Sequence, residues 1–253
     1  MPYPFAAPPP RSAPPPACPE ARAARLPLNA MVLRRPLLRL VPGAEPSLAF
    51  LHLQPNMDAM AAALGSHACD IARHLAEGVA LRMLGALADP RGAMALAWGE
   101  DRAGVAAPPG PEAAPPLLID LPARAIQAGM VAGAGLGSVV SFALGSAADP
   151  VAFAALAEAA RRQGWGVALR GLAANTLAWL RPGAVAADWF ILDWSEGLGE
   201  PASIAALRLL ETDRLILAGC DTDAALHWGL GHNIRIFGGA ALEAWAAGPG
   251  GRA

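Results

Sequence analysis

Lysine is absent from this chain of 253 residues, so each of its 19 basic side chains is an arginine. Because alanine is also used wherever a small apolar residue will serve, we interpret both features as a bias of coding composition. With 21 acidic residues the formal net charge is −2, and the arginines are spread along the chain. A nucleic-acid-binding protein normally carries a basic patch or stripe. The charge pattern therefore gives no support for a nucleic-acid partner.

Cysteine is scarce as well, and the three that occur are Cys18, Cys69 and Cys220. Their number is odd, their spacing is wide and no CxxC pair occurs, which argues against both a disulfide framework and a zinc site. We interpret Cys69 and Cys220 as small apolar side chains. A reduced, cytoplasmic setting is the simplest fit to this pattern.

Long uninterrupted apolar runs are also missing. Hydrophobic residues make up 55% of the chain, yet Gly, Pro and Arg break each run before it is long enough to span a bilayer. With 16% charged residues the chain is too apolar for a disordered protein. We expect an ordered domain over residues 28–247, flanked by disordered tails at 1–27 and 248–253. Prolines interrupt any signal-peptide core in the first tail, for which a Pro-rich docking peptide is the alternative.

Short apolar runs alternate with Ala-rich helical stretches from residue 31 onward, a pattern typical of parallel strands joined by crossover helices. The candidate strands number about eight, as a closed α/β barrel requires, and cover residues 31–41, 47–53, 117–121, 139–144, 166–170, 189–194, 214–219 and 233–238. Only PGAEP separates the first two, which is too short for a crossover helix. We therefore expect these two strands to pair antiparallel.

Helix boundaries are marked by capping residues. Asp149, followed by a proline, predicts a helix start, and Gly164 predicts its end. A long helix is expected over residues 67–88. The Gly/Pro/Ala-rich residues 103–116 and the glycine-rich residues 129–138 are expected to be loops. The second of these precedes a strand, whereas a dinucleotide-binding loop follows one.

The most informative segment is residues 164–195, GWGVALRGLAANTLAWLRPGAVAADWFILDWS. It resembles the middle of the EAL family, phosphodiesterases that hydrolyse the bacterial messenger cyclic di-GMP. In that family a Gly-led apolar strand ends in two adjacent aspartates, and a later strand carries Lys-x-Asp. Here Arg170 and Gly171 stand at the aspartate pair, and Ile191 stands at the lysine. The resemblance spans residues 31 to about 240 and implies a TIM-like (β/α)8 barrel with an antiparallel first strand.

The resemblance also implies a test by residue type, because the family binds two metal ions at the C-terminal mouth of its barrel. Such hydrolysis needs several converging carboxylates. The match places Leu51 at the signature glutamate and Ala218 at a seventh-strand glutamate. It places Phe142, or Ser141 after a slip of one residue, at the fourth-strand glutamate, and Phe237 at the final glutamine. We therefore predict no phosphodiesterase activity, no catalytic residue of this type, no metal and no cofactor.

Three acidic residues still match acidic or polar positions of the family, namely Asp120, Asp193 and Asp221. All three are expected near the C-terminal rim, where they could form a vestigial metal site. Rim aspartates also serve as helix caps and loop acceptors, and Asp221 is expected at the start of the helix after the seventh strand.

The histidines are interpreted as structural. His227 and His232 are five residues apart, which differs from the same-face spacing of helical zinc sites. If Leu51 points into the barrel, strand alternation directs His52 outward.

The leading functional hypothesis is a non-catalytic EAL-like barrel that binds another protein in a bacterial cyclic di-GMP-related signalling pathway. A non-hydrolysing cyclic di-GMP receptor is the weaker alternative, because Gln54 and Pro55 replace the arginine that follows the signature motif. A third reading is a barrel enzyme with a different reaction that uses Arg170 and the three aspartates.

The barrel mouth distinguishes these readings. Arg170, Trp194 and Phe237 are expected there, as a surface for a ligand or a partner. A mouth plugged by Phe142, Trp194 and Phe237 would indicate an interaction protein. An open polar pocket around Arg170 would indicate a ligand.

Overall fold

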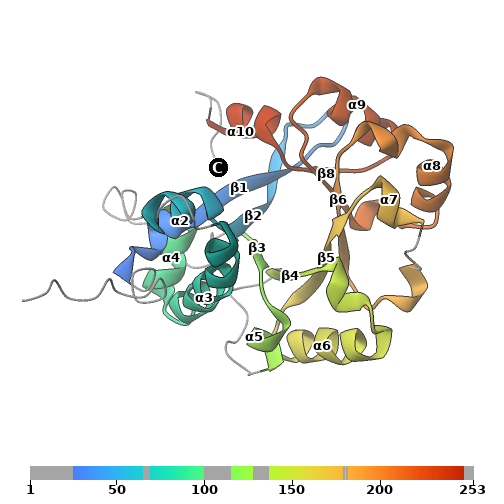
Figure 1. The fold of residues 1–253 in the computed structure, drawn as a ribbon. Coiled ribbons are helices and arrows are strands. Elements are labelled where there is room, and N and C mark those ends of the chain that lie inside the picture. Colours follow the sequence, from blue (N-terminus) through green and yellow to red (C-terminus); the bar gives the residue numbers. More distant parts are fainter. Residues whose placement is uncertain are drawn as a thin grey trace, which may run out of the picture.

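The computed structural model describes residues 25–64, 69–99, 115–127, 137–178, 180 and 182–247. Its strands form a closed barrel in sequence order, with β1 antiparallel to both neighbours and the other neighbours parallel (Figure 1). The strands are β1 (Val32–Arg39), β2 (Ser47–Pro55), β3 (Leu117–Asp120), β4 (Val139–Ala143), β5 (Gly166–Leu172), β6 (Trp189–Asp193), β7 (Leu215–Ala218) and β8 (Ile236–Phe237). The predicted barrel and its antiparallel first strand are confirmed.

Helices surround the barrel on its outer side (Figure 1). The α-helices are α2 (Met57–Leu64), α3 (Cys69–Leu87), α4 (Pro90–Trp98), α5 (Ala123–Gln127), α6 (Pro150–Arg162), α7 (Ala174–Leu177), α8 (Pro201–Leu207), α9 (Asp223–Gly231) and α10 (Ala240–Ala247). Short 3-10 helices lie at Leu28–Met31, Leu144–Ala147, Pro182–Ala184, Glu196–Gly199 and Thr212–Arg214. Helix α3 corresponds to the helix expected over 67–88, whereas α2 and α4 on either side of it were not predicted.

The start of α6 follows the predicted capping chemistry. The Asp149 carboxylate accepts hydrogen bonds from the backbone N–H groups of Val151 and Ala152, at 2.9 and 3.1 Å. These groups have no partner within the helix, so the cap satisfies them. Pro150 occupies the first helical position, where its missing N–H costs nothing.

Two apolar layers result from the alternation of side chains along the strands. One layer fills the barrel and takes one residue from each strand: Leu37, Phe50, Leu118, Val139, Ala168, Ile191, Ile216 and Ile236. Within it the rings of Phe50 and Trp189 meet edge to face across the barrel, with centroids 5.3 Å apart. The other layer packs the outer strand faces against the helices. The barrel is therefore a packed core, and its open space lies at its end.

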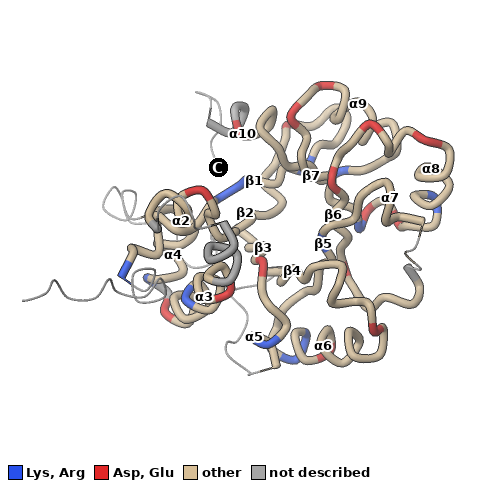
Figure 2. Tube along the Cα trace, viewed as in Figure 1, with Lys and Arg blue, Asp and Glu red and all other residues tan. Residues whose placement is uncertain are grey.

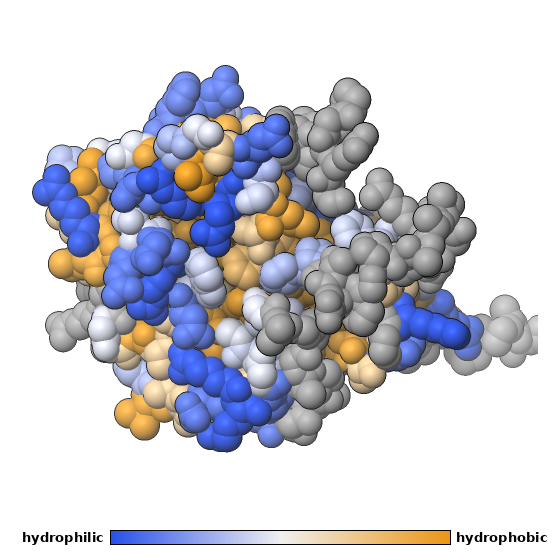
Figure 3. Space-filling view, turned by 180° about the vertical axis from the view of Figure 1, so that it is seen from behind, coloured by the Kyte–Doolittle hydropathy of each residue, from blue (hydrophilic) through white to orange (hydrophobic). Residues whose placement is uncertain are grey.

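Charged residues are scattered over the described backbone and form no stripe of one sign (Figure 2). On the face opposite to the view of Figure 1, polar and apolar residues are mixed (Figure 3). Among the described residues, no helix has the length and apolar character needed to cross a bilayer. Nearly all of the proposed tails and most of the two expected loops at 103–116 and 129–138 lie outside the described residues.

Buried Cys220 behaves as the sequence predicted for a small apolar side chain. Burial raises the pKa of its thiol to about 12, so it stays protonated. Cys18 and the side chain of Cys69 lie outside the described part of the chain.

Candidate functional site

The inward face of β2 differs from the expected one by one residue. Phe50 belongs to the layer inside the barrel, whereas Leu51 and Leu53 belong to the layer beneath the helices. Side chains alternate along a strand, so His52 and Gln54 share the inward face with Phe50. The expectation that Leu51 points in and His52 points out is therefore wrong. Both faces of β2 are buried and apolar, so the pattern of leucines did not reveal which one faces the interior.

The fourth strand shows the same shift. Ser141 faces the barrel interior, where its hydroxyl donates to Asp120. Phe142 points outward and meets Phe153 of α6 edge to face, with ring centroids 6.2 Å apart. Of the two residues considered for the inward position of this strand, Ser141 therefore faces the interior and Phe142 does not.

Two aromatic residues expected at the mouth pack against α9. Phe237 is fully buried and lies so close to α9 that its ring touches Gly229. The Trp194 ring lies against Trp228 of the same helix, with centroids 5.3 Å apart. Neither residue lines the pocket described below. Phe237 faces α9 and not the barrel interior, which corrects its expected position, whereas Trp194 directly follows β6 at the rim of the barrel. The mouth is therefore not plugged by Phe142, Trp194 and Phe237.

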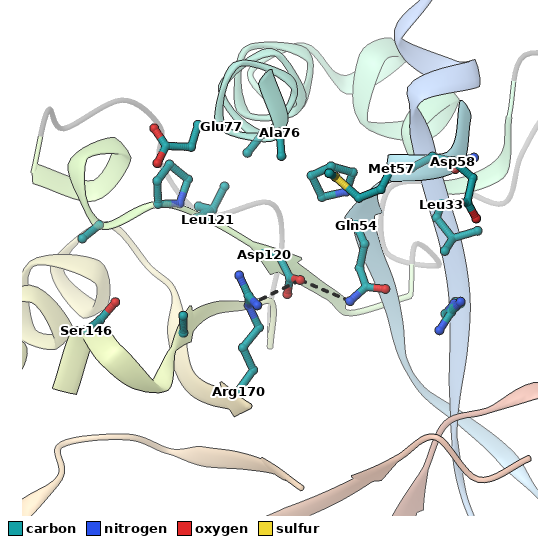
Figure 4. Close-up of a pocket in the computed structure, with 17 residues that line it drawn as sticks. Leu33, Gln54, Met57, Asp58, Ala76, Glu77, Asp120, Leu121, Ser146 and Arg170 are labelled. Carbon is teal, nitrogen blue, oxygen red and sulfur yellow. Dashed lines mark hydrogen bonds and ion pairs between the residues drawn. The ribbon is translucent and has the colours of Figure 1, made fainter. Parts of the chain in front are cut away.

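A pocket of about 650 Å³ opens at the mouth, between the ends of β1 to β5 and helices α2 and α3 (Figure 4). Its apolar lining includes Leu33, Met57 and Leu121. Its polar lining consists of Arg35, Gln54, Asn56, Asp58, Glu77, Asp120, Ser146 and Arg170. Apolar walls with a few converging polar groups are typical of small-molecule sites, and the volume lies within their usual range.

Asp120 is the hub of this site. Its Oδ1 accepts from the Ser141 hydroxyl and lies 2.9 Å from Nε2 of His52. Its Oδ2 accepts from Nε2 of Gln54 at 3.1 Å and lies 3.4 Å from Nε of Arg170. One carboxylate thus connects residues from β2, β4 and β5 to β3. Three of these partners are at hydrogen-bond distance, whereas Arg170 forms an ion pair with Oδ2 and its buried Nε has no hydrogen-bond partner among the described residues.

The neighbouring side chains stabilise the ionised form of Asp120. Burial alone would raise the pKa of its carboxyl, but His52, Arg170 and Ser141 outweigh burial and hold that pKa below its usual value. Asp120 is therefore ionised at neutral pH.

Arg170 lies in β5 at a local irregularity in the pairing of this strand with β6. The register of β5 against β6 shifts between Leu169 and Leu172, and Gly171 adopts a φ of +84°, which a residue with a side chain rarely adopts. The Arg170 side chain, 40% exposed, extends from this point toward Asp120 at the pocket (Figure 4). The second arginine of the pocket, Arg35, lies 3.6 Å from a carboxylate oxygen of Glu243 on α10.

The other two acidic candidates do not join Asp120 in a metal site. Asp193 lies at the end of β6 with part of its surface exposed. Partial burial of its carboxyl raises its pKa, Arg170 opposes that rise, and the charge of Asp120 adds to it. Asp221 accepts a 2.8 Å hydrogen bond from the backbone N–H of Ala240, at the start of α10. Thr222, and not Asp221, caps α9.

The two metal ions implied by the EAL resemblance do not fit these residues. Across the described part of the chain, no three His, Cys, Asp or Glu side chains converge to hold a metal ion. Three side chains already contact the oxygens of Asp120, and the neighbouring positive charge of Arg170 repels a dication.

His232 is held within its own helix region, as expected for a structural histidine. Its ring stacks on Trp228, with centroids 4.3 Å apart, and its Nδ1 lies 2.8 Å from the Trp228 carbonyl oxygen. His52, in contrast, belongs to the hub around Asp120, which sequence reasoning missed. The available signal was that the polar residues His52 and Gln54 share one face of an otherwise apolar strand.

No family model and no curated protein matches the sequence. Among solved structures, the chain is similar to the FimX EAL domain, with 14% identity, a TM-score of 0.52, and coverage of 90% of this chain and 94% of that one. It is also similar to the S helix-GGDEF-EAL chain of Vibrio cholerae LapD, in an apo form (12% identity, TM-score 0.51) and in a form bound to c-di-GMP (13%, 0.51).

The LapD matches cover 84% and 85% of this chain but 53% and 54% of the LapD chain, so this chain spans about half of LapD's length. At these identities the likeness concerns the fold. The chain has the EAL-type (β/α)8 barrel fold.

Proposed function

We propose that this chain is a catalytically inactive EAL-type barrel that acts in the cytoplasm as a non-hydrolysing receptor in a cyclic di-GMP-related signalling pathway. The observation that carries the proposal is the open polar pocket beside Arg170 at the barrel mouth. An interaction protein with a plugged mouth would have no such pocket. A receptor passes its state to another protein, so a protein partner belongs to the proposal as the output of the pathway.

The inward positions of the strands support the loss of hydrolysis. The inward side chains of β2 are Phe50, His52 and Gln54, and none is a carboxylate. On β4 and β6, Ser141 and Ile191 face inward, and the carboxylates that remain on the inward faces are Asp120 at the end of β3 and Asp193 at the end of β6. Metal-assisted phosphodiester hydrolysis needs several carboxylates to hold and orient the ions, and two aspartates beside Arg170 are a poor set for that task. The inward faces of β2 and β4, shifted by one residue from the expected ones, therefore support the same prediction of no phosphodiesterase activity.

The hub does not form a catalytic triad for another reaction. A serine nucleophile needs a histidine that takes its proton and an aspartate that orients the histidine. Here Ser141 and His52 both contact the same oxygen of Asp120, so the imidazole does not lie between the hydroxyl and the carboxylate. This arrangement holds a carboxylate in place and activates no hydroxyl.

The pocket carries groups of the kinds that bind a cyclic dinucleotide. Two arginines, Arg35 and Arg170, bear positive charge suited to phosphate, and the amides of Gln54 and Asn56 are suited to hydrogen bonds with bases. The lining also includes the carboxylates of Asp58, Glu77 and Asp120, so phosphate is expected on the side of the arginines. One LapD structure with this fold is bound to c-di-GMP, which supports the choice of the same ligand as the first one to test.

The test is a calorimetric titration of the chain with cyclic di-GMP, using two matched tryptophan variants. Ala143→Trp places a large side chain in the pocket lining, where it reduces the pocket volume. Ala154→Trp places the same side chain on the exposed side of α6. We expect wild type and Ala154→Trp to bind with equal affinity and Ala143→Trp to lose at least tenfold. Absence of binding to wild type, or equal binding by all three proteins, would contradict the proposal.

A further inference from the structure

Arg170 contacts Asp120 through one edge of its guanidinium group. Its Nε lies 3.4 Å from Oδ2 of Asp120. Among the described residues no hydrogen bond engages its two terminal nitrogens, and the side chain is 40% exposed at the pocket. A guanidinium group has a second edge, formed by those terminal nitrogens, whose two N–H groups match two oxygens of a phosphate or carboxylate. The edge that remains available is the one suited to bidentate binding of an oxyanion.

Asp120 lies beside Arg170 as its counter-ion, with Nε of Arg170 3.4 Å from Oδ2 and no hydrogen bond between the two groups. Ser141, His52 and Gln54 contact the oxygens of the same carboxylate. A divalent ion on this carboxylate would lie close to the positive charge of Arg170, and the two like charges would repel each other. The carboxylate therefore stabilises a guanidinium in a place where the family's resemblance implies a metal ion.

We propose that Arg170 replaces the metal ions of the EAL-type mouth, and that the pocket binds a phosphate or phosphodiester oxyanion through the terminal nitrogens of Arg170 without a divalent cation. The inference rests on the proposed receptor function for the identity of the natural ligand, but the oxyanion chemistry stands on the geometry of Arg170 and Asp120. The result is an anion site that needs no metal loading.

If the inference is correct, a chelator such as EDTA does not change the affinity of the pocket for its oxyanion. A site that bridges an oxyanion through Mg²⁺ loses its ligand when EDTA removes the ion, whereas a guanidinium site does not. A hydrogen bond to a charged group contributes about 1.5–3 kcal/mol, which corresponds to a roughly 10- to 150-fold change in affinity when it is removed. Lysine keeps the charge but lacks the planar fork, so it should recover part of the loss.

The experiment titrates wild type, Arg170→Gln, Arg170→Lys and the control Arg208→Gln with two probes, cyclic di-GMP and inorganic pyrophosphate, in EDTA and again in MgCl2. Arg208 is exposed at the end of α8, away from the pocket lining. We expect wild type and Arg208→Gln to bind equally in both buffers, within twofold. Arg170→Gln should lose at least tenfold for both probes, and Arg170→Lys should fall between. Urea unfolding of each variant verifies that the barrel is intact.

The outcomes separate this inference from the receptor function. Pyrophosphate binding that depends on Arg170 in EDTA, without cyclic di-GMP binding, supports the guanidinium site and overturns the choice of natural ligand. Cyclic di-GMP binding that needs Mg²⁺, or that is unchanged in Arg170→Gln, overturns the guanidinium site and leaves the receptor function standing. Failure of wild type to bind either probe overturns both.

Discussion

The position of Phe237 can be tested through a glycine on the helix that covers it. A Cβ at Gly229 on α9 would lie 2.4 Å from Cε1 of Phe237 and 2.9 Å from Cδ2 of Leu217. Phe237 and Leu217 are both fully buried, so neither side chain can move aside into solvent. Gly229→Ala should therefore overpack the space between β8 and α9.

The magnitude follows from a comparison with Gly231→Ala, two residues further along the same helix, where an added Cβ meets nothing within 4 Å. Replacing glycine by alanine in a helix gains up to ~1 kcal/mol in both variants. Overpacking a close-packed core costs ~1–3 kcal/mol and applies only to Gly229→Ala. The two variants should differ by that amount in the free energy of unfolding. For a chain of this size the difference corresponds to about 2–12 °C in Tm.

Equilibrium urea unfolding, followed by tryptophan fluorescence, measures this difference as a shift in midpoint at constant slope. Gly229→Ala should be the less stable variant. If the two variants differ by less than ~0.5 kcal/mol, an amount typical of surface substitutions, Phe237 does not pack against α9. The correction that removes Phe237 from the barrel mouth would then be unsound.

Three further predictions concern individual side chains. Asp120→Asn should lower the free energy of unfolding at pH 7. Because the folded pKa of Asp120 lies below the unfolded value of about 3.9, its stabilising contribution is present above that value and lost as the pH falls through the folded pKa. Urea unfolding at pH 7, 5, 4 and 3 should therefore show wild type and variant converging in acid, and a constant difference would be inconsistent with this. Cys220 should resist iodoacetamide at pH 8 in the folded chain and react fully in urea, as read from its peptide by mass spectrometry; rapid labelling of folded protein would contradict the buried thiol with its pKa of about 12. Asp149→Ala should cost about 1 kcal/mol in urea unfolding, because two N–H groups at the start of α6 lose their acceptor, and an unchanged midpoint would argue against the cap.

The strands and helix caps could be predicted because they depend on local patterns. Apolar runs bounded by turn residues located each of the eight strands, and Asp149 followed by proline located the start of α6. The antiparallel start followed from the short connection between the first two strands alone.

The inward faces could not be predicted from the apolar residues, because a barrel strand is buried on both sides. In β2 and β4, leucine, valine and phenylalanine occur at odd and even positions alike, so a shift of one residue leaves the pattern unchanged. Phe237 belongs to a strand of only two residues, which is too short to show any alternation. Polar residues carried the missing information, since His52 and Gln54 both turn toward Asp120.

The central claim is that this barrel binds cyclic di-GMP at its mouth and leaves it intact. A single sample tests both parts: radiolabelled cyclic di-GMP is incubated with a molar excess of the chain in MgCl2 and MnCl2, the bound fraction is read by filter retention, and the recovered nucleotide is separated by chromatography. We expect retained nucleotide that remains fully cyclic after prolonged incubation. Linear dinucleotide accumulating with time, or nucleotide that is never retained, would contradict it.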